Sequence, residues 1–226
     1  MTSYKLIRVC KNDQNQLNHL KEQLDNIELS LNIVDLQHPL GKRINIVGGG
    51  GKTTLARALS DRYGYQNIEL DALHFLPNWV ERSAEDFRLQ VDLSIKNAGD
   101  SWVIDGNYFE KLECLSSNID MFIWIDLPWR VMFRRTFVRS LKRMIDRTKI
   151  CGDNFESWSK FFSTDSLWWW YMSNYSDIAN REEMLSRYIP RNVPVIRLSN
   201  TKELDLFYET WIKKVDAKKF QRVNYS

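Results

Sequence analysis

Residues 44–54 read Ile44-Asn45-Ile46-Val47-Gly48-Gly49-Gly50-Gly51-Lys52-Thr53-Thr54. The stretch predicts a β-strand that enters a glycine turn, with a helix starting directly after it. Glycines let backbone N–H groups close around phosphate oxygens, and a helix N-terminus adds the positive end of its dipole. We therefore predict a phosphate-binding loop (P-loop) in which Gly48, Gly49, Gly50, Gly51, Lys52, Thr53 and Thr54 bind a nucleotide. The alternative is a glycine-rich turn that carries an ordinary exposed lysine.

The chemistry expected of this loop rests on its last residues. Lys52 is expected to reach the β- and γ-phosphates of ATP, and the Thr53 hydroxyl to ligate Mg²⁺. The full pattern of such loops has a glycine at the position where this chain has Ile46. The loop is therefore predicted to start at Gly48 and to be about two residues shorter than the full pattern.

Short β-rich runs alternate with helical stretches from residue 42 onward. The expected strands are 44–47, 67–70, 102–104, 121–126 and 194–198, and the expected helices are 53–63, 83–97, a long one from about 130, and 201–215. Strands that alternate with helices indicate βαβ units and a parallel sheet. We expect an α/β fold with a parallel five-stranded sheet and helices on both faces.

Two aspartates follow predicted strands, Asp71 after 67–70 and Asp105 after 102–104. In a parallel sheet the carboxyl ends of the strands face the ligand crevice. Asp71 can orient a hydroxyl or phosphate acceptor and accept its proton. Asp105 can hold Mg²⁺ through water, and Gly106 would let the acceptor approach the backbone. The alternatives are a helix-capping aspartate at 71 and a plain Asp-Gly turn at 105–106.

The helix predicted from residue 130 is strongly basic. Its arginines Arg135, Arg139, Arg143 and Arg147 recur every fourth residue and share one side. Repeated like charges destabilise a helix unless an anion compensates for them. We favour a transferring phosphoryl group as that anion, with Arg135 and Arg139 as catalytic residues. A nucleic-acid backbone and a merely solvated basic face are the alternatives.

The bulk composition is that of an ordinary globular protein. The chain has 226 residues, of which 43% are hydrophobic and 27% charged, and its net charge is +3. So mild a positive charge does not by itself indicate nucleic acid. The three cysteines are scattered, and no apolar run has the length of a signal peptide or a membrane span. We expect a cytoplasmic protein without a membrane partner.

Residues 1–40 form an extension ahead of the phosphate-binding domain at 41–226. Residues 4–9 could form a short strand. A helical seam with heptad spacing follows, made of Leu17, Leu20, Leu24, Ile27, Leu31 and Val34. We favour a helix that packs on its own domain, and the alternative is a homodimer contact through this helix.

Several motifs occur together in a recognisable order. They are Gly48–Thr54, Glu69-Leu70-Asp71-Ala72-Leu73-His74, Pro77-x-Trp79-x-x-Arg82, Trp102–Tyr108, Asp126-Leu127-Pro128 with its arginine helix, and Asn154-x-Glu156-Ser157-Trp158. The combination, over about residues 42–212, resembles the adenylate-kinase-like P-loop proteins known as DNA topology modulation proteins. The resemblance implies a nucleoside-monophosphate-kinase-like fold with a mobile, arginine-rich lid, here about 130–180.

Two details bear on the acceptor. Asp71-Ala72-Leu73-His74 resembles the strand-end motif of gluconate kinases, which phosphorylate a hydroxyl. The arginine that follows Asp-Gly in adenylate kinases and holds the AMP phosphate is absent here, where the chain reads Asp105-Gly106-Asn107-Tyr108. AMP is therefore not expected as the acceptor on this resemblance.

These observations together predict an ATP-dependent kinase that uses Mg²⁺ and transfers a phosphoryl group to a small hydroxyl or phosphate compound. The predicted catalytic residues are Lys52, Asp71, Arg135 and Arg139, the predicted acceptor-binding residues are Asp71, His74, Arg82, Gly106 and Asn107, and the predicted metal ligands are Thr53 and Asp105. The alternative is an ATP-binding regulator associated with nucleic acid that transfers nothing. A pure switch of that kind has no need of Asp71.

Overall fold

A computed structural model describes residues 6–8, 40–108, 118–163, 166, 169, 189 and 193–213. The main sheet is parallel throughout. Its order is β1 (Leu6–Arg8), β10 (Val195–Leu198), β7 (Met121–Ile125), β2 (Arg43–Gly48), β6 (Trp102–Asp105) and β3 (Gln66–Glu69). Because β2 lies between β6 and β7, the segment that follows β2 is placed between the segments that follow its two neighbours.

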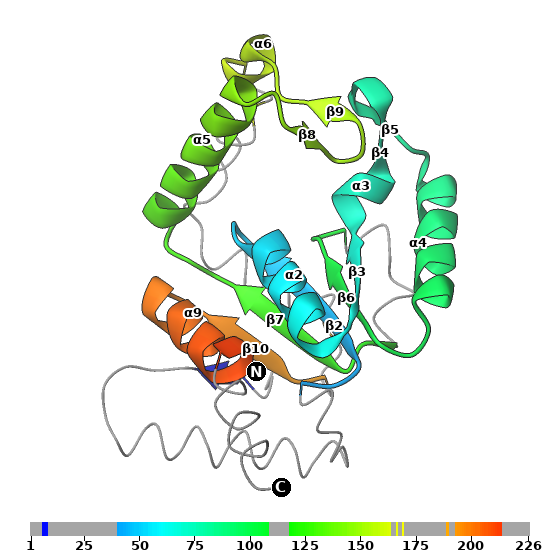
Figure 1. The fold of residues 1–226 in the computed structure, drawn as a ribbon, viewed down its shortest axis with the longest axis vertical. Helices are drawn as coiled ribbons and strands as arrows, with labels where there is room; N and C mark the ends of the chain where they lie inside the picture. Colours follow the sequence, from blue (N-terminus) through cyan, green and yellow to red (C-terminus); the bar gives the residue numbers. More distant parts are fainter. Residues whose placement is uncertain are drawn as a thin grey trace, which may run out of the picture.

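Helices cover both faces of this sheet (Figure 1). One face carries α2 (Lys52–Tyr63) and α9 (Thr201–Phe207), which continues into the π-helix η4 (Tyr208–Lys213), and the other carries α4 (Ala84–Ala98). The pleat of β2 divides its side chains accordingly: Ile44 and Ile46 are buried with α2 and α9, and Val47 is buried with α4. The two apolar layers fix the register of the central strand, because a slip of one residue would exchange the faces.

The predicted α/β class and the five predicted strands are confirmed, and β1 adds a sixth strand at the edge beside β10. The predicted helical seam from Leu17 to Val34 lies outside the described residues, so its role as a dimer contact stays a prediction. The predicted lid region is described as far as residue 163 and at isolated positions beyond it. None of the described helices has the length and apolar character needed to span a bilayer.

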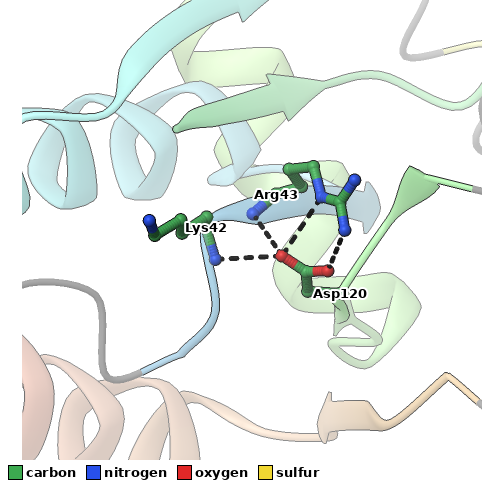
Figure 2. Close-up of polar contacts among 3 residues, drawn as sticks. All are labelled: Lys42, Arg43 and Asp120. Carbon is green, nitrogen blue, oxygen red and sulfur yellow. Dashed lines mark hydrogen bonds and ion pairs between the residues drawn. The ribbon is translucent and has the colours of Figure 1, made fainter. Parts of the chain in front are cut away.

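The amino ends of β2 and β7 are joined by the carboxylate of Asp120 (Figure 2). Its Oδ2 accepts hydrogen bonds from the backbone N–H of Lys42 at 3.1 Å and of Arg43 at 3.0 Å, and from Arg43 Nε at 3.3 Å. Its Oδ1 accepts one from Arg43 Nη2 at 2.7 Å. One carboxylate thus holds the start of β2 against the start of β7, at the end of the sheet away from the glycine loop.

Two segments extend beyond the carboxyl ends of the strands. One follows β3 and comprises α3 (Leu70–His74), β4 (Phe75–Leu76), the 3-10 turn η1 (Pro77–Trp79) and β5 (Val80–Glu81). The other follows β7 and comprises α5 (Trp129–Ile145), the hairpin of β8 (Lys149–Ile150) and β9 (Asn154–Phe155), and α6 (Trp158–Phe161). Figure 1 shows the two segments rising on opposite sides of α2 and meeting where β8–β9 approaches β4–β5.

Candidate active site

The glycine loop is short and tightly enclosed. Strand β2 runs through Gly48 and helix α2 begins at Lys52, so the turn between them is Gly49–Gly51. A Cβ at Gly48 would lie 2.2 Å from the carbonyl oxygen of Ile125, and one at Gly49 would lie 2.3 Å from Met132 Cε. Gly48 also has a φ of +99°, in the left-handed region. The backbone of β7 therefore excludes a side chain at Gly48, and one at Gly49 would require Met132 to move. The turn between β2 and α2 begins after Gly48, in agreement with the shorter loop predicted from Ile46.

The first half of the loop is held by hydrogen bonds within the protein. Asn107 Oδ1 accepts from the Gly48 N–H at 2.8 Å, and Asn107 Nδ2 donates to the Gly48 carbonyl at 2.9 Å. The Gly49 N–H donates to Ile125 O at 2.8 Å, and the Gly50 N–H points at Met132 Sδ at 3.1 Å. The phosphate contacts predicted for these three glycines would therefore require their N–H groups to change partner.

The N–H groups at the start of α2 are better placed for an anion. The first N–H groups of an α-helix have no intrahelical acceptor, and they carry the positive end of its dipole. In α2 these groups belong to Gly51, Lys52, Thr53 and Thr54, and the first i to i−4 bond in the helix is from Leu55 N to Gly51 O. The loop therefore offers phosphate a compact set of donors centred on its last glycine.

Lys52, Thr53 and Asp105 come together beside this turn. Lys52 Nζ donates to Gly48 O at 3.2 Å, and the Thr53 hydroxyl donates to Asp105 Oδ2. Asp105 stands at the carboxyl end of β6, opposite Ile46 of β2 and Glu69 of β3, and only 6% of it is exposed. Burial raises the pKa of Asp105, against which the Lys52 ammonium and the Thr53 hydrogen bond act. A hydroxyl and a buried carboxylate in contact are the oxygen donors that Mg²⁺ prefers.

The second aspartate, Asp71, lies in the first turn of α3, exposed to solvent. Its Oδ1 accepts a hydrogen bond from the Tyr108 hydroxyl at 2.7 Å. Burial, and then the charge of Asp71, raise the pKa of Tyr108, so the phenol keeps its proton and remains a donor. After burial, the charge of Asp71 also contributes to the raised pKa of Asp105.

The other predicted acceptor-binding residues have different surroundings. His74 is 2% exposed, its ring centroid lies 4.8–4.9 Å from those of Phe75, Phe87 and Tyr108, and its Nε2 lies 3.2 Å from Glu81 Oε2. Arg82 Nη1 donates to Asp86 Oδ2 at 2.6 Å, on α4. A Cβ at Gly106 would lie 2.8 Å from Leu70, so this glycine allows close packing against α3. The structure thus brings Asp71 toward the loop with Tyr108, and places His74 inside a cluster of rings and Arg82 beside α4.

The arginines of α5 also differ from one another. Arg135 is the one beside the loop, since its Nη1 lies 3.9 Å from where a Cβ of Gly51 would be. Arg139 lies one turn further along and is partly buried. Arg143 Nη1 lies 3.4 Å from Glu156 Oε1, so it forms an ion pair within the predicted lid region. The arginines that recur every fourth residue therefore do not form one uniform charged face.

Sequence reasoning missed three residues at this site. Tyr108 orients Asp71, Met132 covers Gly49 and Gly50, and the buried Thr136 hydroxyl lies 4.0 Å from where a Cβ of Gly50 would be. For Met132 and Thr136 the sequence signal is the buried stripe of α5, in which Met132, Thr136, Ser140 and Met144 recur every fourth residue.

Comparison with known proteins adds little to this geometry. No protein-family model matches the chain, and no curated protein matches it. A similar solved structure is that of an unliganded sugar kinase from Janibacter sp. HTCC2649, with 16% sequence identity, a TM-score of 0.39, and coverage of 75% of this chain and 93% of that one. A likeness this distant says nothing about the chemistry of the site.

Proposed function

We propose that this protein is an ATP-dependent phosphotransferase that acts on a small hydroxyl or phosphate compound. The observation that carries the proposal is the contact between Thr53 and the buried Asp105, beside Lys52 and the N-terminus of α2. A glycine turn, a lysine, a hydroxyl in the first helical turn and a carboxylate at the end of the neighbouring strand form the set used to bind the phosphates of a nucleotide with Mg²⁺.

Thr53 and Asp105 are the residues that would hold Mg²⁺, and their oxygen donors suit it. When bound, the ion neutralises charge on the phosphates. Lys52 supplies a second positive charge to the phosphates, and Arg135 beside Gly51 supplies a third from α5. These protein groups favour the transition state because they are fixed before the reaction begins.

We further propose that the acceptor binds at Asp71. Its carboxylate is exposed to solvent, and a hydrogen bond of 2.7 Å donated by the Tyr108 hydroxyl fixes its orientation. It can orient an acceptor hydroxyl and take its proton, a role that a protein binding ATP only as a switch does not need. This supports the kinase over the nucleic-acid-associated regulator, and agrees with the resemblance to adenylate-kinase-like proteins.

The proposal is tested by measuring ADP release from Mg·ATP across nucleosides, nucleotides, sugars, sugar acids and nucleic acids. Lys52→Ala is expected to lower ATP affinity or turnover at least about tenfold, which corresponds to about 1.4 kcal/mol. Lys96→Ala, at an exposed lysine in the last turn of α4, is the matched control and is expected to change neither. Unchanged ATP binding and turnover in a folded Lys52→Ala variant would reject the phosphate-binding loop.

A further inference from the structure

Two sequence motifs have no role in the proposed chemistry, Pro77-x-Trp79-x-x-Arg82 and Asn154-x-Glu156-Ser157-Trp158. The structure places the beginnings of these two motifs against each other. The first lies in the arm 75–81, which is β4, η1 and β5. The second lies in the lid hairpin 149–155, which is β8, its turn and β9. Figure 1 shows the lid hairpin reaching across from α5 to this arm.

Asn154 makes the principal contact between them. It is 2% exposed although it lies in a two-stranded hairpin far from the main sheet. Its Nδ2 donates to Leu76 O at 3.0 Å, and its Oδ1 accepts from the Trp79 N–H at 2.8 Å, both in the arm. The same Nδ2 donates to Cys151 O within the hairpin, also at 3.0 Å. One carboxamide thus binds the turn of its own hairpin and two backbone groups that precede it by 75 and 78 residues.

A second contact runs alongside the first. Trp79 Nε1 donates to the carbonyl oxygen of Phe155 at 3.0 Å. The arm adopts an uncommon backbone there, with φ of +64° at Asn78 and +61° at Trp79. Left-handed backbone costs free energy for residues with a Cβ, and it persists only where surrounding contacts enforce it. The hairpin supplies such contacts through the Trp79 N–H and indole.

The contact between the 75–81 arm and the lid hairpin brings the hairpin turn toward Asp71, the predicted acceptor-binding residue. Gly152 lies close to the arm, because a Cβ on it would be 3.9 Å from Phe75 O. Cys151 is partly buried, and its pKa is raised first by burial and next by the charge of Asp71. The His74 ring, next to Phe75 of the arm, lies 4.9 Å from the ring of Tyr108, whose hydroxyl donates to Asp71. The hairpin turn therefore shares the surroundings of the Asp71–Tyr108 pair.

We propose that Asn154 is a positioning residue that fastens the lid hairpin to the 75–81 arm and thereby encloses the acceptor bound at Asp71. This inference rests on the proposed phosphotransferase function. It favours a small molecule over a polymer as the acceptor, because the arm and the hairpin would have to separate for a long chain to pass between them to Asp71. Enclosure also keeps water from competing with the acceptor for the phosphoryl group.

Hydrogen exchange of the full chain, alone and with Mg·ATP, tests the contact directly. Asn154→Ala is expected to increase exchange in peptides covering 75–81 and 149–155 and to leave β2 and β7 unchanged. Asn154→Asp keeps an acceptor for the Trp79 N–H but loses both donations, so an intermediate effect is expected. Asn97→Ala, at an exposed asparagine of α4, is the matched control.

Steady-state kinetics test whether the contact made by Asn154 helps to enclose the acceptor. They use the acceptor found by the ADP-release screen. Asn154→Ala is expected to raise the KM for the acceptor about tenfold or more and to leave the KM for ATP unchanged, which simple destabilisation would not do. Faster exchange confined to 149–155 would overturn the proposal, since Asn154 would then serve only its own hairpin. Loss of protection in β2 and β7 would also overturn it. If no compound accepts phosphate from ATP, the proposed function fails while the exchange result still decides whether the arms are joined.

Discussion

Asn107→Ala separates two roles for the asparagine after β6, support of the glycine loop and contact with the acceptor. Its carboxamide makes hydrogen bonds of 2.8 and 2.9 Å with the N–H and carbonyl of Gly48. Each such bond contributes about 0.5–1.5 kcal/mol net. Water can satisfy the Gly48 groups in the variant, because Asn107 is exposed. Loss of both bonds is therefore expected to destabilise this loop conformation by about 1–2 kcal/mol. If this free energy lowers the population of the binding conformation in full, the apparent affinity for Mg·ATP falls about five- to thirtyfold.

Titration calorimetry with Mg·ATP measures this loss, with Asn97→Ala as the control. Asn107→Asp retains an acceptor for the Gly48 N–H but cannot donate to its carbonyl, and its new negative charge lies near the phosphates. It is therefore expected to bind ATP no better than Asn107→Ala. An unchanged dissociation constant for Mg·ATP in folded Asn107→Ala, together with a raised KM for the acceptor, would refute the loop-support role. It would return Asn107 to the acceptor site predicted from sequence.

Three further predictions concern the charged residues around the loop. Asp71→Asn is expected to abolish transfer and leave ATP binding by calorimetry nearly intact; retained transfer would remove Asp71 from the catalytic residues. Arg135→Ala is expected to lower turnover about tenfold or more, and Arg134→Ala, at an exposed neighbour, to do little; equal small effects, with salt-dependent DNA binding, would favour a nucleic-acid-binding face. Burial raises the pKa of Asp105, so the native state holds its proton more tightly than the unfolded chain, and the contribution of Asp105 to stability falls as pH rises above its ordinary pKa. Asp105→Asn should therefore unfold at higher denaturant than the wild type at about pH 7, with a smaller difference at about pH 4, and should lose Mg²⁺-dependent ATP binding; the opposite pH trend would contradict the burial effect.

The strands of the main sheet could be predicted because each is a short apolar run followed by a helix-forming stretch. The glycine loop could be predicted because its residues are contiguous. The meeting of Thr53 with Asp105 followed from the rule that parallel strands share one carboxyl edge.

Most side-chain pairings between other distant segments could not be predicted in this way. Asn107 and Gly48 are 59 residues apart, and their pairing depends on β6 lying directly beside β2. The burial of His74 among aromatic rings was equally hidden, since a histidine at a strand end looks the same in sequence whether it faces a ligand or a core. Local patterns report the type of element, while side-chain partners depend on the order of the strands.

The pairing of β1 with β10 has a consequence for how the protein is made. β1 is the first described strand to be synthesised and β10 the last, so the pair cannot form until residues 195–198 have left the ribosome. Contacts that close so long a loop form slowly, because the entropy of closure is lost before the contact repays it. Between the synthesis of β10 and its pairing with β1, the outer edge of β10 presents unpaired backbone N–H and C=O groups, which can pair with the same edge of another chain. Chains that lack residues 6–8 would keep that edge open and are expected to aggregate more readily during expression.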